Sequence, residues 1–279
     1  MSSPVSHQPT ATDQSRTTAG SESPMRIGIQ LQQQHADYPD IRRTVDAVEE
    51  LGVDVIFNWD HFFPLSGDPD GRNLECWTML AAWGEQTSRP EIGALVTCNS
   101  YRNPDLLADM ARTVDHISDG RLILSIGAGW FERDYTEYGY DFGTAGSRLD
   151  ALSAALPRIK QRWAALNPQP TRKIPVLIGG GGEKKTLRIV AEHADIWHCF
   201  GDPQTLQRKA SVLGDWCARV GRDPAEITHA TGAGHDPTES GDALHAAGIR
   251  LITIECDGAT GYDLGPLRDW LAFRDDKNR

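Results

Sequence analysis

Asp60 and His61 stand side by side in the apolar segment WDHFFP, directly after a short β-rich run at 53–57. Histidine changes its charge near neutral pH, and a nearby carboxylate can fix the orientation of its ring. The pair therefore predicts acid–base chemistry, with His61 as the candidate catalytic residue. Neighbours on an extended chain point to opposite sides, so the two side chains need not touch. A loop aspartate beside a half-buried histidine is the alternative.

Two glycine segments follow other β-rich runs. The first consists of Gly127, Ala128 and Gly129, and glycines there would let a flat ligand approach the backbone. The second is an unbroken run of four glycines, followed by Lys184 and Lys185 at the start of a helical stretch; its members are Gly179, Gly180, Gly181 and Gly182. Free N–H groups at a helix start bind anions, and lysines in a first turn are better tolerated when an anion neutralises them. We predict a phosphate site at this turn, with a merely flexible turn as the alternative.

Aromatic residues are concentrated in 130–142, which contains six of them. An apolar wall over a planar ligand is one interpretation, and a small satellite core beneath a loop is the other. The two are compatible. The candidate pocket residues are Trp59, Phe62, Trp130, Phe131, Trp197 and His198. His198 is equally consistent with the ordinary end of a strand.

From residue 25 onward, short β-rich runs alternate with amphipathic helical stretches. The predicted strands are 26–31, 53–57, 91–97, 121–127, 175–178, 195–199, 226–231 and 250–255. The predicted helices are 38–51, 73–87, 103–118, 147–166, 182–193, 203–220, 237–247 and 264–274. Eight such units predict an α/β fold, a parallel (β/α)8 TIM barrel, whose active site lies at the carboxyl ends of the strands. An open doubly wound sheet would place G-x-G-x-x-G after the first strand, where QQQH stands instead.

Composition narrows the function classes. The formal charge of −11 argues against a nucleic-acid-binding surface, and no apolar run is long enough to cross a membrane. The five cysteines are scattered and form no C-x-x-C motif, which argues against a disulfide framework or a thiolate metal site. The first strand is not followed by H-x-H, which argues against a metal-dependent hydrolase. We expect a cytoplasmic protein with a disordered tail at 1–24, which has no apolar leader run, and a single barrel domain at 25–279.

Three segments carry a family resemblance. They are WDHFFP (59–64), YRNPDLLADMARTVDHISDGRLILSIGAGWFERDYTEYGYDF (101–142) and PVLIGGGGEKKTLRIVAEHADIWH (175–198). In these segments the chain resembles the bacterial-luciferase-like flavin monooxygenase superfamily, in its branch of coenzyme F420-dependent oxidoreductases. The resemblance implies a TIM barrel that holds a deazaflavin or flavin, with Asp60 at the ring and His61 as the catalytic or ring-orienting histidine. It also implies that 127–129 line the ring, that 179–182 bind the phosphate, and that a non-prolyl cis peptide joins Ala94 and Leu95.

The resemblance implies an enzyme that transfers hydride between F420 and a small, apolar or aromatic substrate. Family members that act on sugar phosphates carry a general-acid glutamate after the glycine segment. Trp130 occupies that position here, which argues against glucose-6-phosphate as the substrate. A monooxygenase that takes reduced FMN from a separate flavin reductase is the nearest alternative. A catalytically silent flavin-binding protein is another. Family members are often homodimers, but the sequence contains no specific interface signal.

Overall fold

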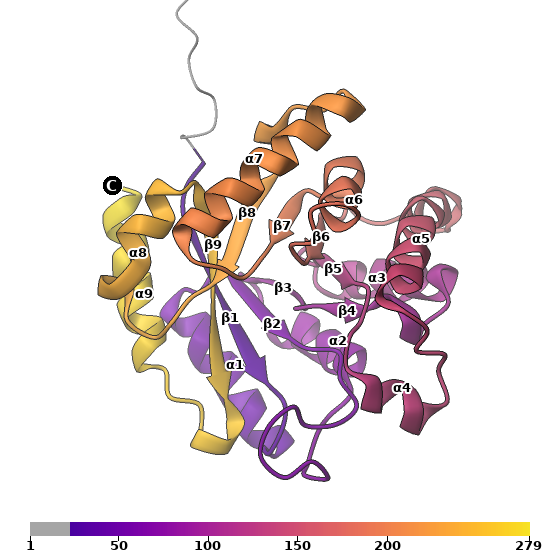
Figure 1. Cartoon of the computed structure of the whole chain (residues 1–279). Coiled ribbons are helices and arrows are strands. Elements are labelled where there is room, and N and C mark those ends of the chain that lie inside the picture. The colour runs from indigo at the N-terminus through magenta and orange to yellow at the C-terminus, as the bar shows by residue number, and fades with distance from the viewer. Residues whose placement is uncertain (1–22) are drawn as a thin grey trace, which may run out of the picture.

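The computed structural model describes residues 23–279 of the chain, so the predicted tail lies outside the described residues except for Ser23 and Pro24. In the described part, nine strands form one parallel sheet in the order β3-β2-β1-β9-β8-β7-β6-β5-β4 (Figure 1). The strands are β1 (Arg26–Gln32), β2 (Val55–Asn58), β3 (Glu91–Ala94), β4 (Thr97–Cys98), β5 (Leu124–Gly127), β6 (Val176–Gly179), β7 (Ile196–His198), β8 (Thr228–Gly232) and β9 (Ile249–Asp257). The sheet curls into a nearly closed TIM-type barrel, which confirms the predicted fold class.

The helices surround this sheet (Figure 1). They are α1 (Tyr38–Leu51), α2 (Cys76–Gln86), α3 (Pro104–Ile117), α4 (Glu132–Tyr138), α5 (Ala145–Ala165), α6 (Thr186–His193), α7 (Pro203–Val220), α8 (Pro237–Ala246) and α9 (Gly265–Lys277). Sequence signals explain several helix starts: Asn103 and Asp202 cap α3 and α7, each followed by a proline. The short helix α4, within the aromatic stretch, was not predicted. None of the described helices combines the length and apolar character that a membrane crossing requires.

The third barrel position departs from the single strand predicted at 91–97. It is split into β3 and β4, and the bond between Leu95 and Val96 is cis. The expected bond, Ala94–Leu95, is wrong by one residue. Ala94 still lies opposite Asn58 in the ladder with β2, and the Leu95 N–H still donates to the Asn58 carbonyl at 2.8 Å. The regular pairing therefore ends only after Leu95.

Two apolar layers hold the barrel together. Inside it, side chains from β2, β6, β7, β8 and β9 meet in one buried cluster, together with Ile123, which directly precedes β5. Between the strands and the helices lies a larger cluster, which includes Ile27, Ile178 and Trp197. Because successive side chains of a strand point to opposite faces, strands such as β2, β6 and β7 contribute to both layers. This alternation decides which residues at a strand end can reach the mouth of the barrel.

The glutamine run after β1 positions the loop that follows β2. Gln33 is fully buried, and its amide nitrogen donates to the carbonyl of Trp59. Gln34 accepts from the Leu65 N–H at 2.8 Å and donates to the Ser66 hydroxyl at 2.8 Å. Buried amides with both ends bonded fix the path of a loop. The run therefore positions the segment that contains Asp60 and His61.

Candidate active site

A cavity of about 430 Å³ opens at the carboxyl ends of the strands. Its walls are made by Gln30, Asp60, His61, Leu95, Val96, Cys98, Tyr101, Gly127, Ala128, Gly129, Trp130, Ala145, Arg148, Leu149, Gly179, Gly180, Thr186, His198 and Phe200. These residues lie at or just after the ends of strands β1 to β7, or belong to helices α5 and α6. The cavity thus lies where barrel folds place their chemistry.

Several residues predicted for the site do not line this cavity. They are Ala94, Gly181, Gly182, Trp59, Phe62, Phe131 and Trp197. Trp197 is buried on the helix side of β7, where its indole N–H donates to the Gly180 carbonyl at 2.8 Å. Its neighbours Ile196 and His198 occupy the inward positions of the same strand. The prediction of Trp197 as a pocket residue is therefore wrong, because the strand alternation turns it outward.

Most of the aromatic stretch forms a satellite core. Tyr135 is fully buried beside Cys98 and Tyr101, with Phe62, Tyr140 and Phe142 packed against them. The ring of Phe62 stacks on Tyr138 with centroids 3.9 Å apart. Of the six aromatic residues in 130–142, only Trp130 lines the cavity, and it is 63% exposed.

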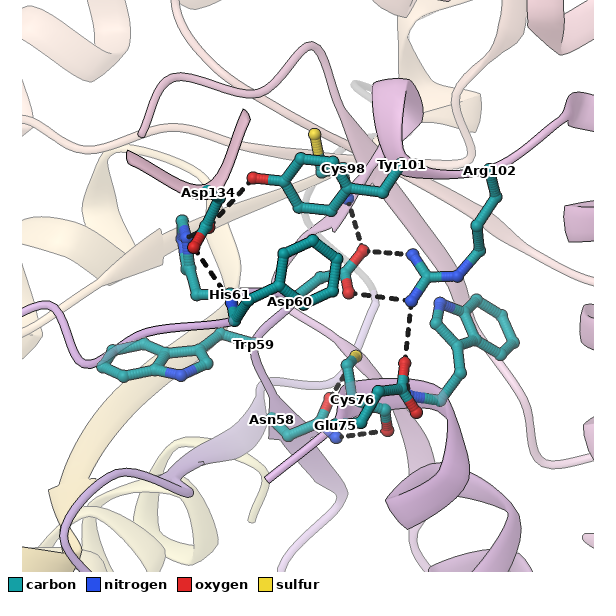
Figure 2. A network of polar contacts seen from close by, with 12 residues as sticks. Asn58, Trp59, Asp60, His61, Glu75, Cys76, Cys98, Tyr101, Arg102 and Asp134 are labelled. Atoms are coloured by element: carbon teal, nitrogen blue, oxygen red, sulfur yellow. Dashed lines mark hydrogen bonds and ion pairs between the residues drawn. The ribbon is translucent and has the colours of Figure 1, made fainter. Parts of the chain in front are cut away.

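Asp60 is held by a buried arginine. Arg102 donates from Nη1 to Asp60 Oδ2 at 2.6 Å and from Nη2 to Oδ1 at 3.0 Å (Figure 2). The same guanidinium reaches Glu75 at 2.8 Å, and the Cys98 N–H also donates to Asp60 Oδ2. Burial alone disfavours the charged guanidinium, but Asp60, together with Cys76 and Glu75, raises the pKa of Arg102 above its ordinary value. Both carboxylate oxygens of Asp60 are therefore engaged by protein donors at the cavity wall.

His61 pairs with Asp134 of α4 rather than with Asp60. The distance from His61 Nδ1 to Asp134 Oδ2 is 2.7 Å, and the carboxylate is fully buried (Figure 2). Asp134 also accepts from the Tyr101 hydroxyl at 2.9 Å and from the Phe62 N–H at 3.1 Å. Burial, together with Cys98 and the Asp134 carboxylate, raises the pKa of Tyr101. Tyr101 thus remains protonated and can donate to Asp134.

Three aromatic rings surround the imidazole of His61. The rings are edge-on, with centroids 5.9, 5.7 and 5.5 Å from that of the imidazole, and belong to Trp59, Trp130 and Phe131. Because Nδ1 is bonded to Asp134, Nε2 is the nitrogen left for a ligand, and among the described residues it has no hydrogen-bond partner. Trp59 and Phe131 therefore support the histidine from outside the cavity rather than form its wall.

The glycine turn reaches the cavity only at its first two residues. Gly181 faces α7, where Lys209 donates to its carbonyl at 2.7 Å. The helix begins at Thr186 rather than at the expected residue 182, so Lys184 precedes it. Lys185 pairs with Asp150 at 2.7 Å and needs no anion to neutralise it. The lysine argument for an anion site is therefore wrong.

Arg148 offers a better anion contact. It is 9% exposed, lines the cavity, and lies 3.9 Å above the ring of Phe142. Its guanidinium donates to the carbonyls of Gly129 at 3.1 Å and Phe142 at 2.7 Å. In the described part of the chain, no carboxylate lies within ion-pair distance of it. A nearly buried arginine without a counterion beside Gly180 and Thr186 is suited to an anionic ligand group.

Sequence reasoning did not single out Asp134, Arg148 or Arg102. Two of them had a visible signal. Arg102 belongs to the polar segment that follows the third strand, and Asp134 is a charged residue within a run of aromatics, where burial requires partners.

A family model described as luciferase-like monooxygenase matches residues 17–246. The chain belongs to the luciferase-like monooxygenase family. An F420-dependent glucose-6-phosphate dehydrogenase of Microbacterium testaceum is 26% identical over 224 residues, 73% of this chain and 66% of that protein. The pyrimidine monooxygenase RutA of an Enterobacter species is 27% identical over 187 residues, 59% of this chain and 48% of that protein. The chain thus spans less than two thirds of the length of these relatives.

The fold of the family is also visible in solved structures. An F420-dependent secondary alcohol dehydrogenase in complex with an F420–acetone adduct superposes with a TM-score of 0.79 at 16% identity. The superposition covers 92% of this chain and 100% of that one. At this identity the likeness shows the shared barrel alone.

Proposed function

We propose that this luciferase-like protein is an F420-dependent oxidoreductase acting on a small, apolar or aromatic substrate. The observation that carries the proposal is the His61–Asp134 pair, at 2.7 Å, with His61 on the wall of a cavity that is also lined by glycine backbone. The names of F420-dependent relatives support the choice of cofactor.

The wall formed by Gly127, Gly179 and Val96 suits a flat ring. A Cβ added at Gly127 would lie 2.7 Å from the Val96 side chain, and one added at Gly179 would lie 3.1 Å from it. A larger residue at Gly127 would force the Val96 side chain to move, and one at Gly179 would press against it. When bound, F420 supplies a ring carbon that accepts or releases hydride. We assign Asp60, Leu95 and Gly127–Gly129 to the ring, as the resemblance implies.

The cofactor phosphate would lie at Arg148. Its guanidinium carries an uncompensated charge, and Thr186 contributes a hydroxyl and an N–H at the start of α6. Gly180 lines the same end of the cavity, but its N–H already donates to the His198 carbonyl at 2.9 Å. Gly180 therefore contributes space for the phosphate, whereas Arg148 contributes charge.

His61 would exchange the proton that accompanies hydride transfer. Asp134 holds Nδ1 and so leaves Nε2 as the nitrogen facing the ligand. The surrounding aromatic rings limit the access of water to the imidazole. A histidine oriented in this way can accept or donate a proton at Nε2.

A second candidate is a monooxygenase that uses reduced FMN, and the similarity to a pyrimidine monooxygenase favours it. The same cavity would then hold a flavin supplied by a separate reductase. A catalytically silent flavin-binding protein would bind either cofactor without turnover.

Titration with four molecules tests these functions: F420, its phosphate-free deazaflavin, FMN and riboflavin. We expect F420 to bind more tightly than FMN, and each phosphate-bearing form to bind more tightly than its phosphate-free counterpart. Tighter binding of FMN than of F420 would reject the F420 assignment in favour of the monooxygenase. Bound F420 that no substrate in a broad screen oxidises or reduces would favour the silent protein.

Arg148→Met tests the phosphate contact, with Arg148→Lys as the matched control that keeps the charge. We expect the methionine variant to bind F420 at least tenfold more weakly, about 1.4 kcal/mol, and to bind the phosphate-free deazaflavin as the unmodified protein does. Equal losses for both ligands would mean that Arg148 acts only through the shape of the pocket.

A further inference from the structure

The cavity contains a second histidine in surroundings unlike those of His61. His198 ends β7, is 3% exposed and lines the cavity. Its Nε2 lies 2.9 Å from the hydroxyl of Thr253. Among the described residues, no carboxylate lies within ion-pair distance of this ring. Where His61 has an anionic partner, His198 therefore has a neutral one.

Two threonines determine which ring nitrogen carries the proton. The Thr253 hydroxyl contacts His198 Nε2 and, at 3.3 Å, the carbonyl of Thr231. A carbonyl can only accept, so a hydroxyl that satisfies both contacts donates to Thr231 and accepts from His198. Nε2 then carries the hydrogen and Nδ1 presents a lone pair. The other tautomer would leave the contact with Thr231 without a hydrogen.

The lone pair on His198 Nδ1 has no donor within the part of the chain that the structure describes. No described residue donates to this atom, although the ring lies in the cavity wall. Burial lowers the pKa of His198 to about 4, so the ring is neutral at physiological pH. A neutral imidazole with Nε2–H bonded to protein can only accept at Nδ1.

The surroundings of His198 are apolar and aromatic. Phe200 lies edge-on to the imidazole with centroids 5.1 Å apart, and it is 67% exposed at the mouth of the cavity. Trp130 is the other exposed aromatic residue of the wall. A ligand group that lies beside His198 meets the ring of Phe200 and the lone pair at Nδ1.

We propose that His198 Nδ1 is the specificity-determining acceptor of this cavity and selects apolar or aromatic substrates that carry one O–H or N–H donor. A ligand without a donor would remove water from Nδ1 and leave it unpaired, which costs binding free energy. The proposal rests on the proposed function only in taking this cavity as the substrate site. Thr253 acts through His198 and is a positioning residue.

Nitrogen-15 NMR of the imidazoles tests the tautomer in the protein without any cofactor. We expect His198 to show a protonated Nε2 and an unprotonated Nδ1 at neutral pH. Thr253→Ser keeps the hydroxyl and should preserve this pattern. Thr253→Val removes the hydroxyl, so we expect both tautomers of His198 to be populated. A protonated Nδ1 in the unmodified protein, or an unchanged spectrum in Thr253→Val, would overturn the assignment.

A matched pair of probes tests the selectivity. Binding of 4-ethylphenol and 4-ethylanisole, which differ in the donor hydrogen and one methyl group, can be followed by the same NMR signals. We expect the phenol to bind about fivefold more tightly, the range for one net hydrogen bond, and His198→Phe to abolish the preference. Thr253→Val should weaken the preference even if His198→Phe fails to fold.

Equal binding of the two probes, or a preference that survives both substitutions, would overturn the proposal. These outcomes are separable from failure of the proposed function. Both measurements omit the cofactor, so a protein that rejects F420 and FMN would refute the proposed function and leave the result at His198 intact.

Discussion

The imidazole of His61 is bonded to a carboxylate 73 residues further along the chain, that of Asp134, at 2.7 Å. The adjacent carboxylate, Asp60, is instead engaged by Arg102. Two residues that are neighbours in sequence therefore serve separate networks. One holds the candidate catalytic ring, and the other holds a carboxylate at the cavity wall.

Replacing His61 by alanine tests its role. If the imidazole transfers a proton, turnover should fall by about 10²–10⁴-fold, while the cofactor Kd changes little because ring and phosphate contacts lie elsewhere. If the imidazole only orients the cofactor ring, affinity and turnover should fall together by a smaller factor. A lower Tm with turnover preserved per folded molecule would identify a structural histidine. Kd, turnover and Tm should therefore be measured on one preparation.

Asp134→Asn should lower both stability and turnover. The carboxylate accepts three hydrogen bonds, and an amide would point an N–H at one or more of the donors. We expect a loss of about 1–3 kcal/mol in the free energy of unfolding, measured with urea. Turnover should fall with little change in cofactor Kd, because the orientation of His61 is lost.

Tyr101→Phe is the control for Asp134→Asn. It removes one donor to Asp134 but leaves the His61 contact in place. Its turnover should stay close to that of the unmodified protein. An equal loss of turnover in both variants would contradict a specific role for Asp134 in holding the imidazole.

Gly180→Asp should place a negative charge at the phosphate end of the cavity. Gly180 has a φ of +126°, and an added Cβ would lie 3.2 Å from Thr186, so any side chain there is strained. Gly180→Ala measures that strain without the charge. Beyond the alanine effect, we expect the aspartate to weaken F420 binding at least tenfold, about 1.4 kcal/mol, and to spare the phosphate-free deazaflavin. Equal Kd values in the two variants would remove the phosphate assignment.

The buried His198 should make the protein less stable in acid. Its pKa is lowered from 6.5 to about 4 in the folded state, so below pH 6.5 the unfolded chain binds a proton that the folded chain does not. Stability is therefore complete above pH 6.5 and falls as the pH approaches 4, by up to about 3 kcal/mol from this group.

Urea unfolding of the unmodified protein and His198→Asn across this pH range measures the contribution. The asparagine variant should lose less stability than the unmodified protein between pH 6.5 and 4. Parallel curves for the two proteins would show that His198 titrates normally.

The sequence by itself determined the barrel and the face that carries the site. Apolar runs of four to seven residues that alternate with amphipathic helices predict parallel strands joined by crossovers, and this pattern is local. Strand ends then locate His61, the glycines of β5 and β6, and His198 without any tertiary information. Those residues do line one cavity.

Only the tertiary structure decided which side chains meet. The partner of His61 is Asp134 of α4, and a local sequence pattern cannot predict a contact between residues 73 positions apart. Trp197 points outward because of its place in β7. This strand has only three residues, too few to show an alternation of apolar and polar side chains in the sequence, and its register is set by pairing with β6 and β8. The break after Leu95 likewise depends on where pairing with β2 ends. Side-chain direction and long-range pairing emerge only when the strands are assembled.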